Sequence, residues 1–128
     1  MHQRSIAFAL TLAVMLGFGA TAQAGETLGR GAFKGESGHR TEGHASIVRD
    51  GGKTMVVLEK DFDHDGAPAP FVGLGKGGYD PKAQLAKLRN NKGKQAYELP
   101  AGLDASKYDQ VYIWCEKYSV SLGVAKLK

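Results

Sequence analysis

The sequence lacks several features that would assign it to a common class. It has one cysteine, Cys115, so no disulfide can form within the chain. Its net charge at pH 7 is +4, and acidic and basic residues alternate along it. Without a basic stripe, the sequence gives no sign of nucleic-acid binding. Its glycines have no period of three, which excludes a collagen repeat. At 128 residues it has room for one domain.

The longest apolar run covers residues 6–20 and is shorter than the roughly 20 residues that span a bilayer. Arg4 precedes this run, and Ala22-Gln23-Ala24 follows it as a small-x-small cleavage site. We therefore predict that residues 1–24 are a secretory signal peptide cleaved after Ala24. The product would be periplasmic or secreted, with no transmembrane segment after removal of the signal peptide. The alternative to a cleaved signal peptide is that residues 1–24 remain as an N-terminal membrane anchor. Residues 25–30 are expected to be flexible.

Residues 25–128 predict an all-β domain, because their 16 glycines and short apolar runs favour strands joined by tight turns. Asp50-Gly51 before residues 54–58 is typical of a hairpin. Residues 109–115 alternate most clearly, with Cys115 on one face and Trp114 on the other. We expect one antiparallel β-sandwich or partly closed barrel of about seven to eight short strands over residues 31–127.

Three segments are less clearly defined. Residues 82–89 fit either a short helix or an irregular strand. Residues 61–70 are expected to form a loop. Residues 118–124 alternate between apolar and polar, which predicts a last strand that buries Tyr118, Val120, Leu122 and Val124 on one face.

Two motifs resemble ligand sites but lack the expected context. Residues 61–66 resemble the opening of a calcium loop, with Asp61, Asp63 and Asp65 in alternation. The twelfth position would be Val72 rather than glutamate, so an acidic turn is favoured over calcium binding. The glycines of residues 73–78 match a dinucleotide spacing, but no helix is predicted to follow, which favours a turn.

Histidines give a further candidate for metal binding. His39 and His44 are five residues apart and would face opposite sides of a regular strand. We therefore favour surface positions for His39, His44 and His64, and we predict no metal site.

Cys115 is the main candidate functional residue, with Trp114 as its neighbour. A thiolate there could ligate haem iron or a soft metal, or take part in one-electron or exchange chemistry. A chain without Cys-x-x-Cys-His cannot bind haem covalently, so any haem would be held non-covalently by Cys115. Met55 or one of the three histidines would then supply the opposite ligand. These roles require a reachable thiol, whereas a buried thiol would act as a small apolar side chain.

The order of these segments resembles the DM-thirteen domain, a small extracellular family often found beside DOMON and cytochrome-type modules. The resemblance runs from about Gly31 to Leu127. It is carried by Phe33, His44-Ala45-Ser46-Ile47, Leu58, Asp61-Phe62, Ala67-Pro68-Ala69-Pro70-Phe71-Val72, Leu74, Leu88, Gly93-Lys94-Gln95-Ala96-Tyr97-Glu98-Leu99-Pro100, Tyr108-Asp109-Gln110-Val111-Tyr112-Ile113-Trp114-Cys115, Tyr118-Ser119-Val120 and Leu122-Gly123-Val124-Ala125.

The resemblance implies an all-β fold and a role in electron transfer, with Cys115 as a bare redox thiol or as a ligand to a group such as haem. Because the DOMON and cytochrome modules are not found beside it in this sequence, electron transfer would need a separate redox or cytochrome partner protein. The alternative function is a non-enzymatic binding module in which Cys115 is structural. A stand-alone enzyme ranks third, since no acid–base constellation is visible.

Overall fold

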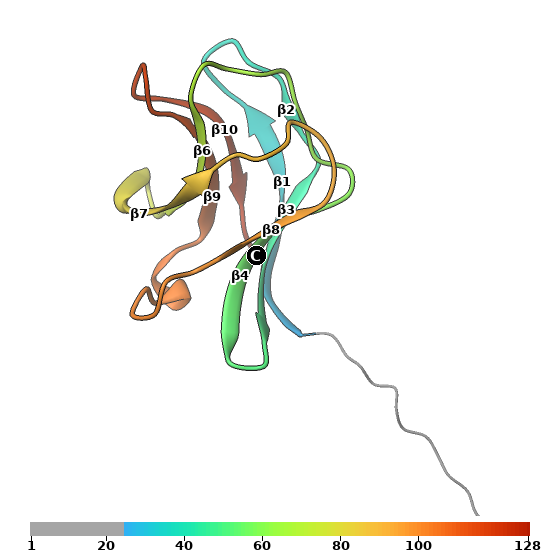
Figure 1. Cartoon of the computed structure of the whole chain (residues 1–128), viewed down its shortest axis with the longest axis vertical. Coiled ribbons are helices and arrows are strands. Elements are labelled where there is room, and N and C mark those ends of the chain that lie inside the picture. The colour runs from blue at the N-terminus through green and yellow to red at the C-terminus, as the bar shows by residue number, and fades with distance from the viewer. Residues whose placement is uncertain (1–24) are drawn as a thin grey trace, which may run out of the picture.

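The computed structural model describes residues 25–128, and the predicted signal peptide lies outside them. Its strands form an eight-stranded antiparallel sheet, in the order β7-β6-β9-β10-β1-β3-β4-β8, and a two-stranded sheet, β2-β5. The large sheet curls almost into a barrel (Figure 1), so the predicted all-β class is confirmed. The strands are β1 (Glu26–Gly35), β2 (Thr41–Glu42), β3 (His44–Asp50), β4 (Lys53–Leu58), β5 (Asp63–His64), β6 (Pro70–Gly75), β7 (Tyr79–Lys87), β8 (Gln95–Glu98), β9 (Gln110–Cys115) and β10 (Val120–Lys126).

The predicted hairpin joins β3 to β4. Asp50 pairs with Lys53 across a two-residue turn, and both turn glycines have positive φ, 59° at Gly51 and 86° at Gly52. Two successive positive φ angles match the twist of the flanking strands, and glycine adopts them without a Cβ clash. The local sequence therefore fixes the register of this pair.

Strand β9 pairs with β6 on one side and β10 on the other. Val111, Ile113 and Cys115 are buried on its inner face, as the alternation predicts. Strand β10 differs, because a bulge between Ser121 and Gly123 interrupts its register with β9. The prediction that Tyr118 is buried is wrong: it lies before β10 in a turn and is 62% exposed.

Other segments also differ from expectation. Residues 25–30 were expected to be flexible, whereas β1 begins at Glu26 and pairs with β3 from Glu26 to Ala32. Of the two alternatives for residues 82–89, the irregular strand is correct: β7 pairs with β6 through two register shifts. The expected loop at residues 61–70 contains β5, which pairs with β2. The β1–β3 and β2–β5 pairings join strands that are not consecutive in the sequence, and local patterns do not reveal them.

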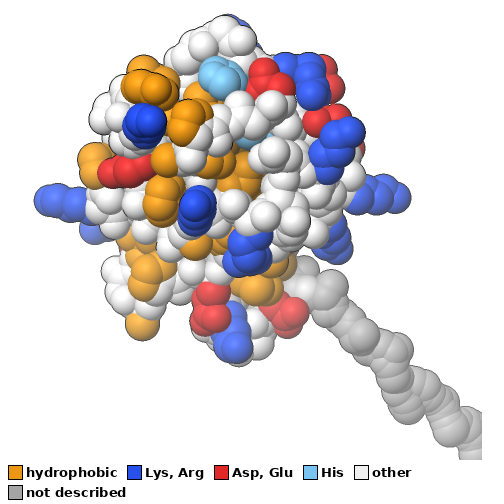
Figure 2. Space-filling view, turned by 45° about the horizontal axis from the view of Figure 1, so that its top comes forward, with side chains coloured by type: hydrophobic (Ala, Val, Ile, Leu, Met, Phe, Trp, Pro, Cys, Tyr) orange, Lys and Arg blue, Asp and Glu red, His pale blue; other side chains and the backbone are white. Residues whose placement is uncertain are grey.

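A single apolar core fills the interior and draws side chains from most strands. On the face that Figure 2 shows, hydrophobic side chains lie among separate lysine, arginine and acidic groups rather than in one charged stripe. Within residues 25–128, no helix combines the length and apolarity needed to cross a membrane.

Candidate functional site

Cys115 ends β9, between Pro70 of β6 and Val120 of β10. Its side chain belongs to the core, and the residue is 1% exposed. Beyond it, the Glu116 amide donates a hydrogen bond to the Ala69 carbonyl at 2.9 Å, which extends the β6–β9 pairing by one residue. A reagent in solution therefore has no direct path to this thiol.

This burial bears on the roles that the sequence suggested for Cys115. A partner's sulfur must approach the thiol for disulfide exchange, and a haem needs an open cavity beside it. Five cavities at the surface of residues 25–128 are lined by other residues. Haem ligation by Cys115 therefore does not fit this arrangement of side chains.

Trp114 lies on the opposite face of β9 from Cys115 and is half-buried. Its indole ring is stacked on the phenol ring of Tyr79, with the ring centroids 4.2 Å apart and the planes 6° from parallel. Tyr112 contacts both rings edge-on, at centroid distances of 5.6 Å from Tyr79 and 6.5 Å from Trp114. We call these three side chains the aromatic trio. They bring β9 and β7 together on the outer face, although β6 separates these strands in the sheet.

Glycine makes room for the trio. A Cβ added at Gly73 of β6 would lie 2.7 Å from Cε1 of Tyr79, so the phenol ring covers a position that has no side chain. Tyr79 is held from the other side by Gln84, whose Nε2 donates to its hydroxyl at 2.9 Å and to Oε2 of Glu116 at 2.8 Å. Burial raises the pKa of the Tyr79 phenol, which keeps it protonated.

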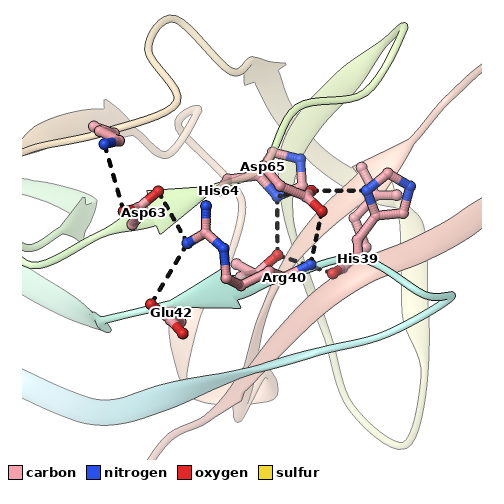
Figure 3. Close-up of polar contacts among 9 residues, drawn as sticks. His39, Arg40, Glu42, Asp63, His64 and Asp65 are labelled. Carbon is pink, nitrogen blue, oxygen red and sulfur yellow. Dashed lines mark hydrogen bonds and ion pairs between the residues drawn. The ribbon is translucent and has the colours of Figure 1, made fainter.

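A cluster of polar side chains surrounds the small sheet (Figure 3), where Thr41 of β2 pairs with His64 of β5. Asp65 accepts hydrogen bonds at Oδ1 from Nδ1 of His39, at 2.8 Å, and at Oδ2 from the Arg40 amide, at 3.0 Å. The His39 and His64 rings are stacked with their centroids 5.8 Å apart. The three side chains of His39, His64 and Asp65 therefore converge.

His64 corrects the prediction that the three histidines lie at the surface. Its side chain is 0% exposed, and Nε2 has no hydrogen-bond partner among the described residues. Burial lowers its pKa, because a charged imidazolium loses hydration there, and His39 lowers it further. A buried imidazole of this kind is neutral at pH 7. The sequence offered no signal for this burial, since β2 and β5 are each two residues long.

His44 lies in a separate group, as its spacing from His39 predicts. Its Nδ1 lies 2.6 Å from Oδ2 of Asp61, and Asp61 also accepts a hydrogen bond from the His44 amide at 2.9 Å. These bonds lower the pKa of Asp61. The neighbouring Glu59 is already bound to Arg30 by two hydrogen bonds, of 2.8 and 2.9 Å.

The three carboxylates of the calcium-like segment do not share one site. Asp61 contacts His44, Asp65 contacts His39, and Oδ1 of Asp63 pairs with Arg40 at 3.1 Å. Because each carboxylate has its own positive or hydrogen-bonding partner, the segment acts as an acidic turn that connects β5 to its surroundings.

A family model described as electron transfer DM13 matches residues 32–127, which is most of the chain. No curated protein and no solved structure matches it.

Proposed function

Because this chain belongs to the electron transfer DM13 family, we propose that it exchanges single electrons with a separate redox partner protein, using Cys115 as its redox group and Trp114 as the contact with the surface. The observation that carries this proposal is the placement of the two residues. They are neighbours in β9, with the thiol in the core and the indole in the outer aromatic trio. An electron can cross this short covalent link although no reagent reaches the sulfur.

The proposed reaction is a one-electron oxidation. The Cys115 thiol loses one electron and one proton and becomes a thiyl radical. The electron passes through Trp114 to a metal centre of the oxidised partner, which is reduced by one electron. The proton passes to water that reaches the sulfur when the core around Cys115 opens transiently. This route replaces the direct thiol contact that the sequence suggested, because it requires only that the indole be reachable.

The test is one-electron photo-oxidation of the purified protein with a ruthenium tris-bipyridine oxidant, followed by transient absorption. The sequence has a single tryptophan, so a tryptophan radical is assigned to Trp114 without ambiguity. We expect this radical to decay at least tenfold more slowly in Cys115→Ser than in the unsubstituted protein. Tyr118→Phe removes an exposed phenol outside the trio and should leave the decay unchanged.

The sealed position of Cys115 also favours a second candidate, a non-enzymatic binding module in which the thiol is structural. Equal decay of the Trp114 radical with and without the thiol would support that function and end the first proposal. The two candidates are therefore separated by one measurement.

We also propose that the protein is exported and that cleavage occurs after Ala24, which would place Gly25 just before β1. This proposal is supported by the charged start, apolar run and small-x-small site of residues 1–24. N-terminal sequencing of protein from a cell envelope or secreted fraction should begin at Gly25. Recovery of the chain in the cytoplasm with Met1 retained would contradict export.

A further inference from the structure

We propose that His39, His64 and Asp65 form a binding site for a divalent transition-metal ion of the zinc and cobalt type. One nitrogen from each ring and one oxygen from the carboxylate lie within 4.8 Å of one another. Two imidazoles and a carboxylate suit borderline ions such as Zn²⁺, Co²⁺ and Cu²⁺ better than Ca²⁺ or Mg²⁺, which prefer oxygen ligands alone. This inference concerns a site separate from Cys115 and does not rest on the electron-transfer proposal.

The spacing of the donor atoms is close to what an ion requires. Oδ1 of Asp65 lies 2.8 Å from Nδ1 of His39 and 3.7 Å from Nδ1 of His64. Around a tetrahedral ion with ligand bonds of about 2.0–2.2 Å, neighbouring donor atoms are about 3.3–3.6 Å apart. Shifts of about half an ångström would therefore bring Asp65 Oδ1 to this distance from both nitrogens. The two rings offer nitrogens within 4.8 Å of each other, and these would have to approach by up to about 1.5 Å.

The backbone already holds the ligands in place. Asp65 is fixed by two bonds to Arg40: its amide donates to the Arg40 carbonyl at 3.1 Å, and its Oδ2 accepts from the Arg40 amide at 3.0 Å. His64 is fixed in β5, where its amide donates to the Asn91 carbonyl at 2.8 Å. Little freedom is lost when an ion binds, because a preorganised first shell needs little further ordering.

The protonation state of His64 also suits a ligand. Its Nε2 has no partner among the described residues, so the ring's tautomer is decided at Nδ1, where the contact is the Thr41 hydroxyl at 2.9 Å. In the metal-free ring Nδ1 carries the proton, because the Thr41 hydroxyl donates its own hydrogen to the Leu122 carbonyl. An ion at Nδ1 replaces this one neutral hydrogen bond, and the ring then carries its proton on Nε2. Metal ions bind neutral imidazole, the form that burial favours here.

Charge and access favour a cation as well. The Arg40 guanidinium pairs with Glu42 and Asp63, and Lys92 pairs with Asp63. Among the described residues, no arginine or lysine side chain pairs with Asp65 (Figure 3). The charge of Asp65 is therefore left for His39 or for an ion. The side chains of His39 and Asp65 are 30% and 34% exposed, which opens the site to solvent while His64 closes its base.

The test is a titration of the untagged protein with Co²⁺, followed by its visible absorption and by displacement with Zn²⁺. We expect one ion per chain, with no effect of equimolar Mg²⁺ or Ca²⁺ and weaker binding as the pH falls, because protons compete for the histidines. A near-ultraviolet charge-transfer band from sulfur to Co²⁺ would place the ion at Cys115 and overturn the proposal. Absence of Co²⁺ binding at millimolar concentration would also overturn it.

Substitutions of the three proposed ligands test where the ion binds. His39→Ala and Asp65→Asn change partly exposed side chains, and each should weaken Co²⁺ binding at least tenfold. The matched control is His44→Ala, which removes a similarly exposed histidine paired with a carboxylate, and it should leave binding unchanged. His64→Gln tests the buried ligand, and the two exposed variants decide the outcome if this variant fails to fold. Binding that survives His39→Ala, or that is lost equally in His44→Ala, would contradict the assignment.

Discussion

The hydroxyl of Thr41 connects the small sheet to the large one. It donates a hydrogen bond to the Leu122 carbonyl of β10 at 2.9 Å and lies 2.9 Å from Nδ1 of His64. A hydroxyl has one hydrogen, so Nδ1 must be the donor in its contact with Thr41. The neutral imidazole satisfies this arrangement and leaves Nε2 without a proton.

The first prediction is that protein stability falls as the pH drops below about 6.5, the ordinary pKa of histidine. Burial lowers the pKa of folded His64, so the unfolded chain binds its proton first, and acid then favours unfolding until the lowered pKa is reached. The charge of Asp65 and a hydrogen bond to the Arg40 backbone oppose this shift, whereas the charges of His39 and Arg40 add to it. Urea unfolding between pH 5 and 8 should show this as a positive slope of the free energy of unfolding against pH.

Two variants separate His64 from other titrating groups. His64→Gln should lower the free energy of unfolding by about 1–3 kcal/mol at pH 7.5, because a buried hydrogen bond is perturbed, and should flatten the slope. His44→Gln, at a partly exposed histidine, should keep the slope. Asp61 and Asp65 have lowered pKa values, so the stability they contribute is lost only below about pH 4. A slope that survives in His64→Gln would contradict the assignment.

The second prediction concerns access to Cys115. Because the residue is 1% exposed, alkylation of the native thiol by iodoacetamide should proceed only through opening of the core. Its rate should rise with urea in parallel with unfolding. Cys115→Ser should cost about 1–3 kcal/mol, since a buried hydroxyl replaces an apolar sulfur. Rapid, stoichiometric alkylation in buffer would contradict this prediction. It would show that the sulfur of Cys115 is reachable and would support disulfide exchange as the reaction of this thiol.

The sequence predicts those parts of the fold that depend on local patterns. Asp50-Gly51 predicts a hairpin because its turn geometry is set by two residues, and the structure confirms it. The alternation at residues 109–115 predicts which side chains of β9 enter the core, because side chains of a strand point to opposite faces in turn. Both signals lie within a few residues and require no knowledge of the partner strand.

The remaining features depend on contacts between distant segments. The start of β1 is ordered because β3 supplies its hydrogen bonds. His64 is buried because Thr41, Asn91 and Leu122 come together around it, and none of these lies within 20 residues of it in the sequence. The sequence predicts Trp114 as a candidate residue but not its stack on Tyr79, because strand β6 lies between the strands that carry the two rings.

The third prediction tests the polar contacts of edge strand β8. The buried Tyr97 hydroxyl donates to Oε1 of Gln95 and accepts from the Arg89 amide at 2.9 Å. Tyr97→Phe removes both hydrogen bonds and leaves the Arg89 amide without this acceptor, so we expect a loss of about 1–3 kcal/mol in the free energy of unfolding. Tyr118→Phe, at a residue that is 62% exposed, should change it by less than about 0.5 kcal/mol. Equal effects of the two substitutions in urea unfolding would contradict the prediction.

The fourth prediction uses glycine to disturb the aromatic trio without changing an aromatic residue. In Gly73→Ala the new Cβ would lie 2.7 Å from Cε1 of Tyr79 and 3.2 Å from the Ala83 carbonyl oxygen, so the phenol ring that is stacked on Trp114 must shift. We expect a loss of about 1–3 kcal/mol from overpacking and a shift in the fluorescence of the single tryptophan.

Gly77→Ala is the matched control in the adjoining turn. Its Cβ would enter open space, but φ at Gly77 is 68°, so the substitution should cost about 1–2 kcal/mol in backbone strain and leave the Trp114 fluorescence unchanged. Stability alone therefore does not separate the two variants, whereas the tryptophan signal does. If Trp114 passes electrons through its stack with Tyr79, Gly73→Ala should also slow reduction of a partner, and Gly77→Ala should not. A variant with an altered Trp114 signal and an unchanged transfer rate would show that Trp114 exchanges electrons without Tyr79.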